Sequence, residues 1–125
     1  MTTEMISQDF LKQSKYGFYK FPKSLIADQR ISDISNDAKI LYMLFIDRLT
    51  LSKINGWVDK QGDVYIYYSV KNICKDLHCH SQKVSKLLNE LEFDAGIICR
   101  KQQGQGKPNR IYPRVLEEIY PQAMR

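Results

Sequence analysis

Side chains that can contact an anionic polymer are concentrated in residues 81–110 of this chain. Residues 81–89 combine valine and leucine with donor-rich polar side chains, namely Ser81, Gln82, Lys83, Ser85, Lys86 and Asn89. Amide and ammonium groups on one face of a helix match the hydrogen-bonding groups that base edges present in a DNA major groove. This pattern favours a recognition helix. On these residues alone, a merely solvated helix face remains the alternative.

A second group of cations follows in a stretch that is typical of a β-hairpin. Two β-rich segments, residues 97–101 and 110–115, flank a polar loop with two glycines and a proline. Residues 100–114 carry five basic and no acidic side chains. Such a loop suits phosphate, because glycine lets the backbone approach closely and the cations neutralise charge. We expect DNA contacts from Arg100, Lys101, Gln103, Gln105, Lys107, Asn109 and Arg110, and further phosphate contacts from Tyr68, Lys71 and His80.

Residues 74–80 contain two cysteines and two histidines, a combination that must be tested against metal binding and catalysis. A zinc site usually draws four ligands from two well-spaced pairs. Here Cys74 fits an inward-facing helix position, and His78 and His80 flank a turn. A catalytic cysteine also needs an oxyanion-binding turn, which does not accompany this cluster. Residues 104–107 resemble a phosphate loop but precede a strand. We expect no catalytic residue, no metal and no cofactor.

Two short helices must position the polar residues of 81–89. Apolar side chains recur at helical spacing in both, first Val70, Ile73, Cys74 and Leu77, then Val84, Leu87, Leu88 and Leu91. Ser69 and Ser81 stand at the expected N-cap positions. Residues 78–80 leave room only for a tight turn between the helices. Helix, turn, helix and basic hairpin in this order predict a helix-turn-helix with a wing.

The preceding chain predicts a scaffold helix and one strand. Ser35 should cap a helix over residues 36–52, and Asn55-Gly56 should end it. Gln61-Gly62-Asp63 should turn the chain into a strand over residues 64–68, with its tyrosines facing away from the core. Pro113 lacks a backbone donor, so the last strand should be an edge strand. The apolar residues expected to bury the scaffold helix are Ile40, Leu41, Leu44, Phe45, Leu49 and Leu51.

These elements predict an α+β fold, a winged helix-turn-helix with a small antiparallel sheet and an N-terminal arm. The 125 residues allow one core. We expect residues 1–17 to form the arm, residues 18–116 the winged-helix domain and residues 117–125 the start of a linker. Apolar side chains in residues 5–21 make the arm a candidate self-association contact. The net charge of +5 fits an anionic partner. Without an apolar run of ~20 residues or a signal-peptide pattern, we expect a cytoplasmic protein that does not contact membranes.

Five stretches resemble the N-terminal domain of RepA_N-family plasmid replication initiators: FYKFPKSL, SNDAKILYMLFIDRLTLS, NGWVDKQGDVYIYYSV, SQKVSKLLNELE and RKQQGQGKPNRIY. The family occurs on plasmids of Gram-positive bacteria. The resemblance implies a winged helix that binds double-stranded DNA at origin repeats (iterons), commonly as a dimer. It also implies a C-terminal domain, absent from this chain, that engages host replication proteins. Residues 94–97 depart from the Glu-Gly-Leu-like turn that the family pattern would have.

Two functions of different class follow from these observations. The first is sequence-specific binding of duplex DNA at plasmid origin repeats to initiate plasmid replication. The second is a winged helix used as a transcriptional regulator or as a protein-interaction module, with the N-terminal arm as its contact surface.

Overall fold

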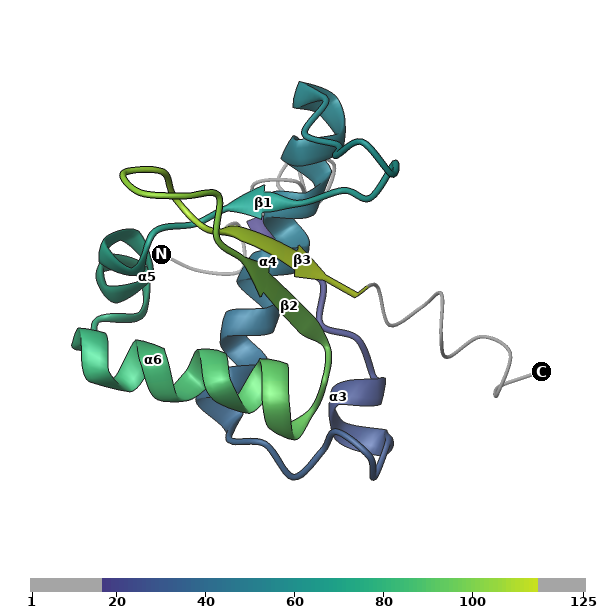
Figure 1. Ribbon diagram of the computed structural model, residues 1–125. Helices are drawn as coiled ribbons and strands as arrows, with labels where there is room; N and C mark the ends of the chain where they lie inside the picture. The colour runs from purple at the N-terminus through teal and green to yellow at the C-terminus, as the bar shows by residue number, and fades with distance from the viewer. Residues whose placement is uncertain (1–16, 115–125) are drawn as a thin grey trace, which may run out of the picture.

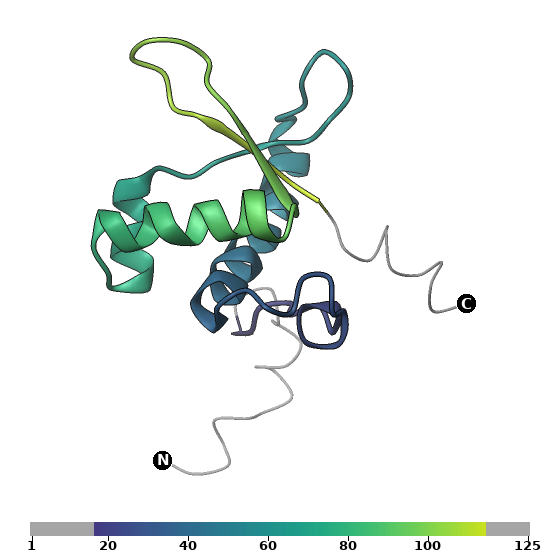
Figure 2. The same ribbon diagram turned by 60° about the horizontal axis from the view of Figure 1, so that its bottom comes forward.

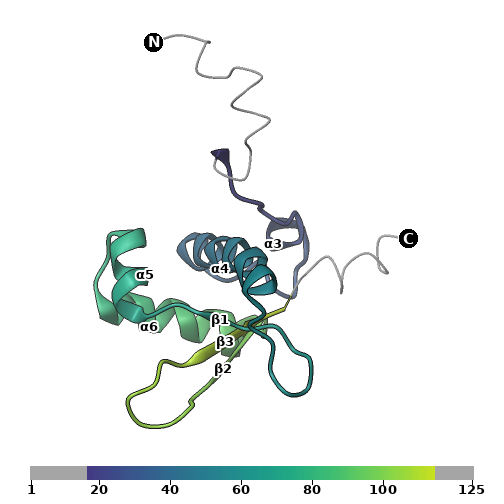
Figure 3. The same ribbon diagram turned by 90° about the horizontal axis from the view of Figure 1, so that it is seen from above.

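Helix α4 (Asn36–Asn55) is the scaffold against which the other elements pack. The computed structural model describes residues 17–114, apart from the side chains of residues 50, 51, 53 and 54. The predicted arm, up to residue 16, and the predicted linker lie outside the described residues. Helices α5 (Val70–Leu77) and α6 (Ser81–Asn89) lie on one side of α4, and the sheet lies beside them (Figures 1 and 3).

The start of α4 and the Asn55-Gly56 stop are as predicted, although the helix runs to Asn55 rather than to residue 52. The Ser35 hydroxyl accepts a hydrogen bond from the Ala38 amide at 3.2 Å, which satisfies one of the free donors of the first turn. Gly56 follows the last helical residue with a φ of +74°, a conformation that favours glycine. Leu41, Phe45 and Leu49 are buried as expected, whereas Ile40 is 41% exposed. The expectation for Ile40 was wrong, because this residue lies at the margin of the buried face.

The sheet has three antiparallel strands in the order β1-β3-β2, where β1 is Ile66–Tyr67, β2 is Ile98–Lys101 and β3 is Arg110–Pro113. The predicted hairpin is therefore confirmed, but β3 is central and the expectation of an edge strand was wrong. Arg114 donates to Ile97 on the β2 side, so the nitrogen of Pro113 faces the β1 side. The two-residue β1 pairs only with Ile111 and Arg110. Because β1 does not reach the position opposite Pro113, no hydrogen bond of the sheet needs a donor at that residue.

Helices α5 and α6 form the predicted helix-turn-helix. The Ser69 hydroxyl accepts from the Asn72 amide at 3.1 Å and caps α5, and His78 ends that helix in the left-handed conformation with a φ of 55°. Helix α6 differs from the expectation by one residue. Ser81 is its first helical residue, and His80 occupies the N-cap position without a side-chain cap. Val70 was expected in the core but is 39% exposed, while Ile73 is fully buried.

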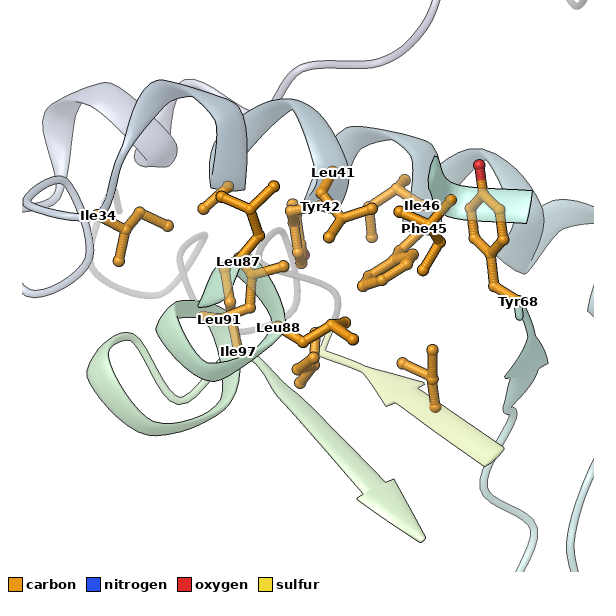
Figure 4. Packing of buried hydrophobic residues seen from close by; sticks show 14 of the residues in the cluster. Ile34, Leu41, Tyr42, Phe45, Ile46, Tyr68, Leu87, Leu88, Leu91 and Ile97 are labelled. Atoms are coloured by element: carbon orange, nitrogen blue, oxygen red, sulfur yellow. The ribbon is translucent and has the colours of Figure 1, made fainter. Parts of the chain in front are cut away.

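The core fills the space between α4, α6 and the inner face of the sheet (Figure 4). Leu87, Leu88 and Leu91 approach α4 from below, as their helical spacing predicts. Tyr68 also belongs to this core, with 6% of its surface exposed and its ring edge-on to Phe45 at 5.7 Å between centroids. It was expected to face outward. Strand alternation instead places it on the same side as Ile66.

Residues 18–27 lie on the side of α4 away from the sheet and include the short helix α3 (Ser24–Ala27), which follows Pro22 (Figure 3). Leu25 is fully buried and anchors this segment to the core. Phe18, Tyr19 and Phe21 are 57%, 51% and 39% exposed. Within residues 17–114, no helix has the length and apolar character needed to cross a membrane.

Candidate nucleic-acid interface

The outer face of α6 carries all six polar side chains that the sequence singles out. Val84, Leu87 and Leu88 are at most 4% exposed, and their burial fixes the rotation of the helix about its axis. Ser81, Gln82, Lys83, Ser85, Lys86 and Asn89 are all exposed. Because the apolar face of α6 packs in the core, the polar face on its opposite side points to solvent.

Lys83 marks the side of this face that borders α4. Its ammonium group lies 2.5 Å from a carboxylate oxygen of Asp37, in an ion pair that is half exposed on both sides. The hydrogen bond with Asp37 raises the pKa of Lys83, and the charge of Asp37 adds to this effect. A ligand of α6 would meet Lys83 already paired, whereas Lys86 has no ion pair among the described residues.

The hairpin of β2 and β3, which we call the wing (residues 98–113), projects from the same side of the molecule as the outer face of α6 (Figure 3). Lys101, Gln105, Lys107 and Asn109 are exposed. Gly104 has a φ of +119° and so allows the loop at the tip to turn. The tip thus presents cations and amide groups beside the recognition helix.

Two of the predicted wing contacts have partners within the protein. Arg100 forms an ion pair with Glu92 at 2.5 Å and donates to the Asn89 side chain at 2.9 Å. These bonds join the wing to the end of α6. The Gln103 amide donates to the Pro108 carbonyl at 2.9 Å and to the Tyr67 hydroxyl at 3.3 Å. Both side chains are half-buried, and both fix the position of the wing.

The outer face of the sheet is covered by aromatic rings that hold two of the basic residues in place. Tyr65 contacts Tyr67 edge-on at 5.3 Å and Tyr112 at 5.8 Å. The Arg110 guanidinium lies 4.3 Å from the centre of the Tyr65 ring, and the Lys101 ammonium lies 4.8 Å from that of Tyr112. Hydrogen bonding to the hydroxyls of Tyr112 and Tyr67 raises the pKa of Arg110. The cations therefore have restricted positions.

The three predicted phosphate contacts have different environments. Lys71 and His80 are exposed, near the start of α5 and of α6. Tyr68 is buried, and its hydroxyl donates to Asp76. The Arg48 guanidinium lies 3.7 Å from the centre of the Tyr68 ring. Burial raises the pKa of the Tyr68 hydroxyl. Tyr68 thus packs in the core and its hydroxyl is engaged within the protein, while a phosphate contact from it stays a prediction.

The cysteines and histidines of residues 74–80 do not converge. Cys74 and Cys79 are half-buried and pack against the core, whereas His78 and His80 are exposed. Over the described part of the chain, no three His, Cys, Asp or Glu side chains are grouped so that they could hold a metal ion.

Three residues near the interface, Glu90, Glu92 and Lys60, were not singled out from the sequence. Glu90 and Glu92 connect the end of α6 to Ser35 and to the wing. Lys60 and Gln61 lie in a short hairpin whose arms are joined by a bridge between Val58 and Val64. The turn at residues 61–63 was visible in the sequence. The proximity of this turn to the wing depends on how the strands pair, and the sequence alone did not predict it.

Comparison with a protein-family model relates the chain to known proteins. The family described as "Replication initiator protein A (RepA) N-terminus" matches residues 17–124. A "41 kDa protein" of Lactobacillus helveticus is 36% identical to the chain, over 76% of this chain and 28% of that protein. The chain thus spans less than a third of this relative's length.

Three solved structures have a similar fold. One described as "N-Terminal domain of DNA binding protein" gives a TM-score of 0.71 at 32% identity, over 90% of this chain and 88% of that one. A structure described as "Structure of Rep-DNA complex" gives a TM-score of 0.71 at 31% identity, over 90% of this chain and 92% of that one. A third, described as "Structure of MDR initiator", gives a TM-score of 0.67 at 32% identity, over 92% of this chain and 95% of that one. The resemblance noted in the sequence is confirmed, and the chain belongs to the family of RepA replication initiator N-termini.

Proposed function

We propose that this domain binds double-stranded DNA sequence-specifically, at the repeats of a plasmid origin, and so serves to initiate plasmid replication. The observation that carries the proposal is that the wing and the side of α6 that faces away from α4 lie on the same side of the molecule (Figure 3), since that side of α6 carries its exposed polar residues. The Arg100 bonds to Glu92 and Asn89 support a fixed angle between them. Family membership and the structural similarity to a Rep–DNA complex support the same role. The role is one of binding, without a catalytic step.

In this proposal α6 lies in the major groove and the wing lies over the adjacent backbone or minor groove. Gln82 suits a bidentate contact to adenine, and Lys86 suits the acceptors of guanine. Ser81, Ser85 and His80 lie at or near the start of α6, where contacts to flanking phosphates are favourable. Lys107 and Asn109 at the wing are available for phosphate or minor-groove contacts. Arg100 and Gln103 act mainly by holding the wing in position.

Replacement of Gln82 tests whether α6 reads bases. Two duplexes are compared by gel-shift titration at one stated salt concentration, one with origin repeats and one with the same bases scrambled. Gln82→Ala should lose about 1–3 kcal/mol on the repeat duplex and little on the scrambled one, because a base-specific contact contributes only to the correct sequence. Gln29→Ala, at an exposed glutamine near α3, is the matched control. Equal losses on both duplexes for Gln82→Ala would contradict base reading.

Self-association through the N-terminal arm completes the proposed role, because origin repeats place several sites side by side. The exposed rings of Phe18, Tyr19 and Phe21, which continue from the arm, favour a contact of this kind. Deletion of residues 1–15 should then lower the molecular mass measured by sedimentation equilibrium. An unchanged mass would remove the arm as a dimer contact. Engagement of host replication proteins through a C-terminal domain, and a cytoplasmic location, belong to the same proposal.

A further inference from the structure

A second hairpin, formed by residues 58–64, projects in the same direction as the wing (Figure 2). Val58 and Val64 form its bridge, and the Gly62 amide donates to the Asp59 carbonyl at 3.0 Å. The Asp59 carboxylate accepts from the backbone amides of Gln61 and Asp63, both at 2.9 Å. These bonds define the turn and leave the side chains of Lys60 and Gln61 exposed.

A cavity of about 270 Å³ lies between this hairpin and the base of the wing. We call it the basic notch. Its lining comes from two segments far apart in the sequence, with Val58, Asp59, Lys60 and Gln61 from the hairpin and Lys101, Arg110 and Tyr112 from the wing. Sheet pairing brings these segments together, since β3 lies between β1 and β2.

The charges of the basic notch favour an anion. Lys60, Lys101 and Arg110 are three cations facing one carboxylate, that of Asp59. The Asp59 carboxylate is already engaged by backbone amides, and the hydrogen bond from the Asp63 amide is the main cause of its lowered pKa. The notch therefore carries excess positive charge.

Two aromatic rings restrain two of the three cations of the notch. Lys101 lies over Tyr112, and Arg110 lies over Tyr65. Cations restrained in this way lose less side-chain entropy when they bind an anion. A tetrahedral phosphate group with charged oxygens matches such a set of donors better than a planar base does.

We propose that the basic notch binds a backbone phosphate of the DNA duplex, beyond the segment contacted by the wing. Hairpin 58–64 is then a third DNA-contacting element, with Lys60 as its principal contact. This inference rests on the proposed DNA-binding function and extends the contacted surface to a flanking part of the duplex. Because the contact is to phosphate, it adds affinity for every sequence alike.

Lys60→Ala tests the inference against Lys23→Ala, which removes the same charge from an exposed lysine next to α3, behind α4. Binding of a synthetic mixed-sequence duplex is measured over a range of salt concentrations. Loss of one phosphate contact should reduce the slope of log affinity against log salt by about 0.9 for Lys60→Ala and leave the slope unchanged for Lys23→Ala. In the unaltered chain, the amide NMR signals of Lys60 and Gln61 should shift on addition of the duplex.

The outcomes separate the two proposals. If the chain binds the duplex but Lys60→Ala has the same slope as Lys23→Ala, and the amide signals of Lys60 and Gln61 do not shift, the basic notch is not a phosphate site and only the further inference fails. If the unaltered chain binds neither this duplex nor one with origin repeats, the proposed function fails and the inference fails with it. A reduced slope together with shifted signals supports both.

Discussion

Glu90 should stabilise the domain by completing the cap of α4 from a distant part of the chain. Its carboxylate accepts from the Ser35 amide at 2.7 Å and from the Ser35 hydroxyl at 2.9 Å. The same hydroxyl accepts from the Ala38 amide. In a capping box the acidic residue lies three positions after the cap in the same helix. Here it comes from η2 (Glu90–Asp94), the π-helical turn that follows α6.

The expected magnitude follows from these contacts. Loss of a serine N-cap costs about 0.5–2 kcal/mol, and a hydrogen bond to a charged group contributes about 1.5–3 kcal/mol before solvent exposure weakens it. We expect Glu90→Ala to lower the free energy of unfolding by about 1–2 kcal/mol, and Ser35→Ala by a similar amount. Because the two residues act together, the double variant should lose less than the sum of both, with a coupling energy of about 1 kcal/mol.

Urea unfolding of the four proteins, followed by the fluorescence of the single tryptophan Trp57, measures this coupling. Asp94→Ala removes an exposed carboxylate from the same turn and serves as a control that should change stability little. If the losses of Glu90→Ala and Ser35→Ala add to within about 0.3–0.5 kcal/mol, the two residues are independent. The shared cap would then be refuted.

Three further predictions concern charge, acid stability and the core. Lys107→Ala should weaken binding to all duplexes alike and lower the salt slope by about one unit in a filter-binding titration; a loss confined to one sequence would contradict a phosphate contact. Hydrogen bonding from Arg30 lowers the pKa of Asp28 from 3.8 to about 2, so its stabilising effect is present above about pH 4 and lost as the pH falls toward 2. Thermal melts across this range should show a smaller pH dependence for Asp28→Asn, and an unchanged profile would refute the assignment. Tyr68→Phe should lower the free energy of unfolding in urea by about 1 kcal/mol, because it removes the hydrogen bond from the Tyr68 hydroxyl to Asp76. The DNA affinity should stay unchanged. A loss of DNA affinity of the same size would instead support a contact between Tyr68 and phosphate.

Local pattern was sufficient to predict the orientation of the recognition helix. Burial of Val84, Leu87 and Leu88 requires only that every third or fourth residue be apolar, and this periodicity is present in the sequence itself. The cap at Ser69 was equally predictable, since one hydroxyl and one nearby amide decide it. Features determined within about one helical turn were therefore accessible without the structure.

Features that depend on distant partners were not accessible in the same way. Pro113 was assigned to an edge strand, and the error arose because the shortness of β1 cannot be inferred from residues near Pro113. The ion pair of Arg100 with Glu92 joins a strand to the end of a helix, and the basic notch joins two hairpins. Each requires a known sheet order before the side chains can be placed together.

The length of η2 constrains the chain more strongly than its composition does. The Ala95 amide donates to the Glu90 carbonyl five residues earlier, so this segment contains one residue more than a regular α-helical turn accommodates. Deletion of one residue here would close the wide turn into a regular α-helical turn and leave β2 in the same register. Deletion of a second residue has no such outlet and would draw β2 back by one position along its partner strand. A slip of one position moves alternate side chains to opposite faces of a sheet, so Ile98 would leave the interior and Arg100 would lose Glu92. The segment therefore allows the loss of one residue but not of two.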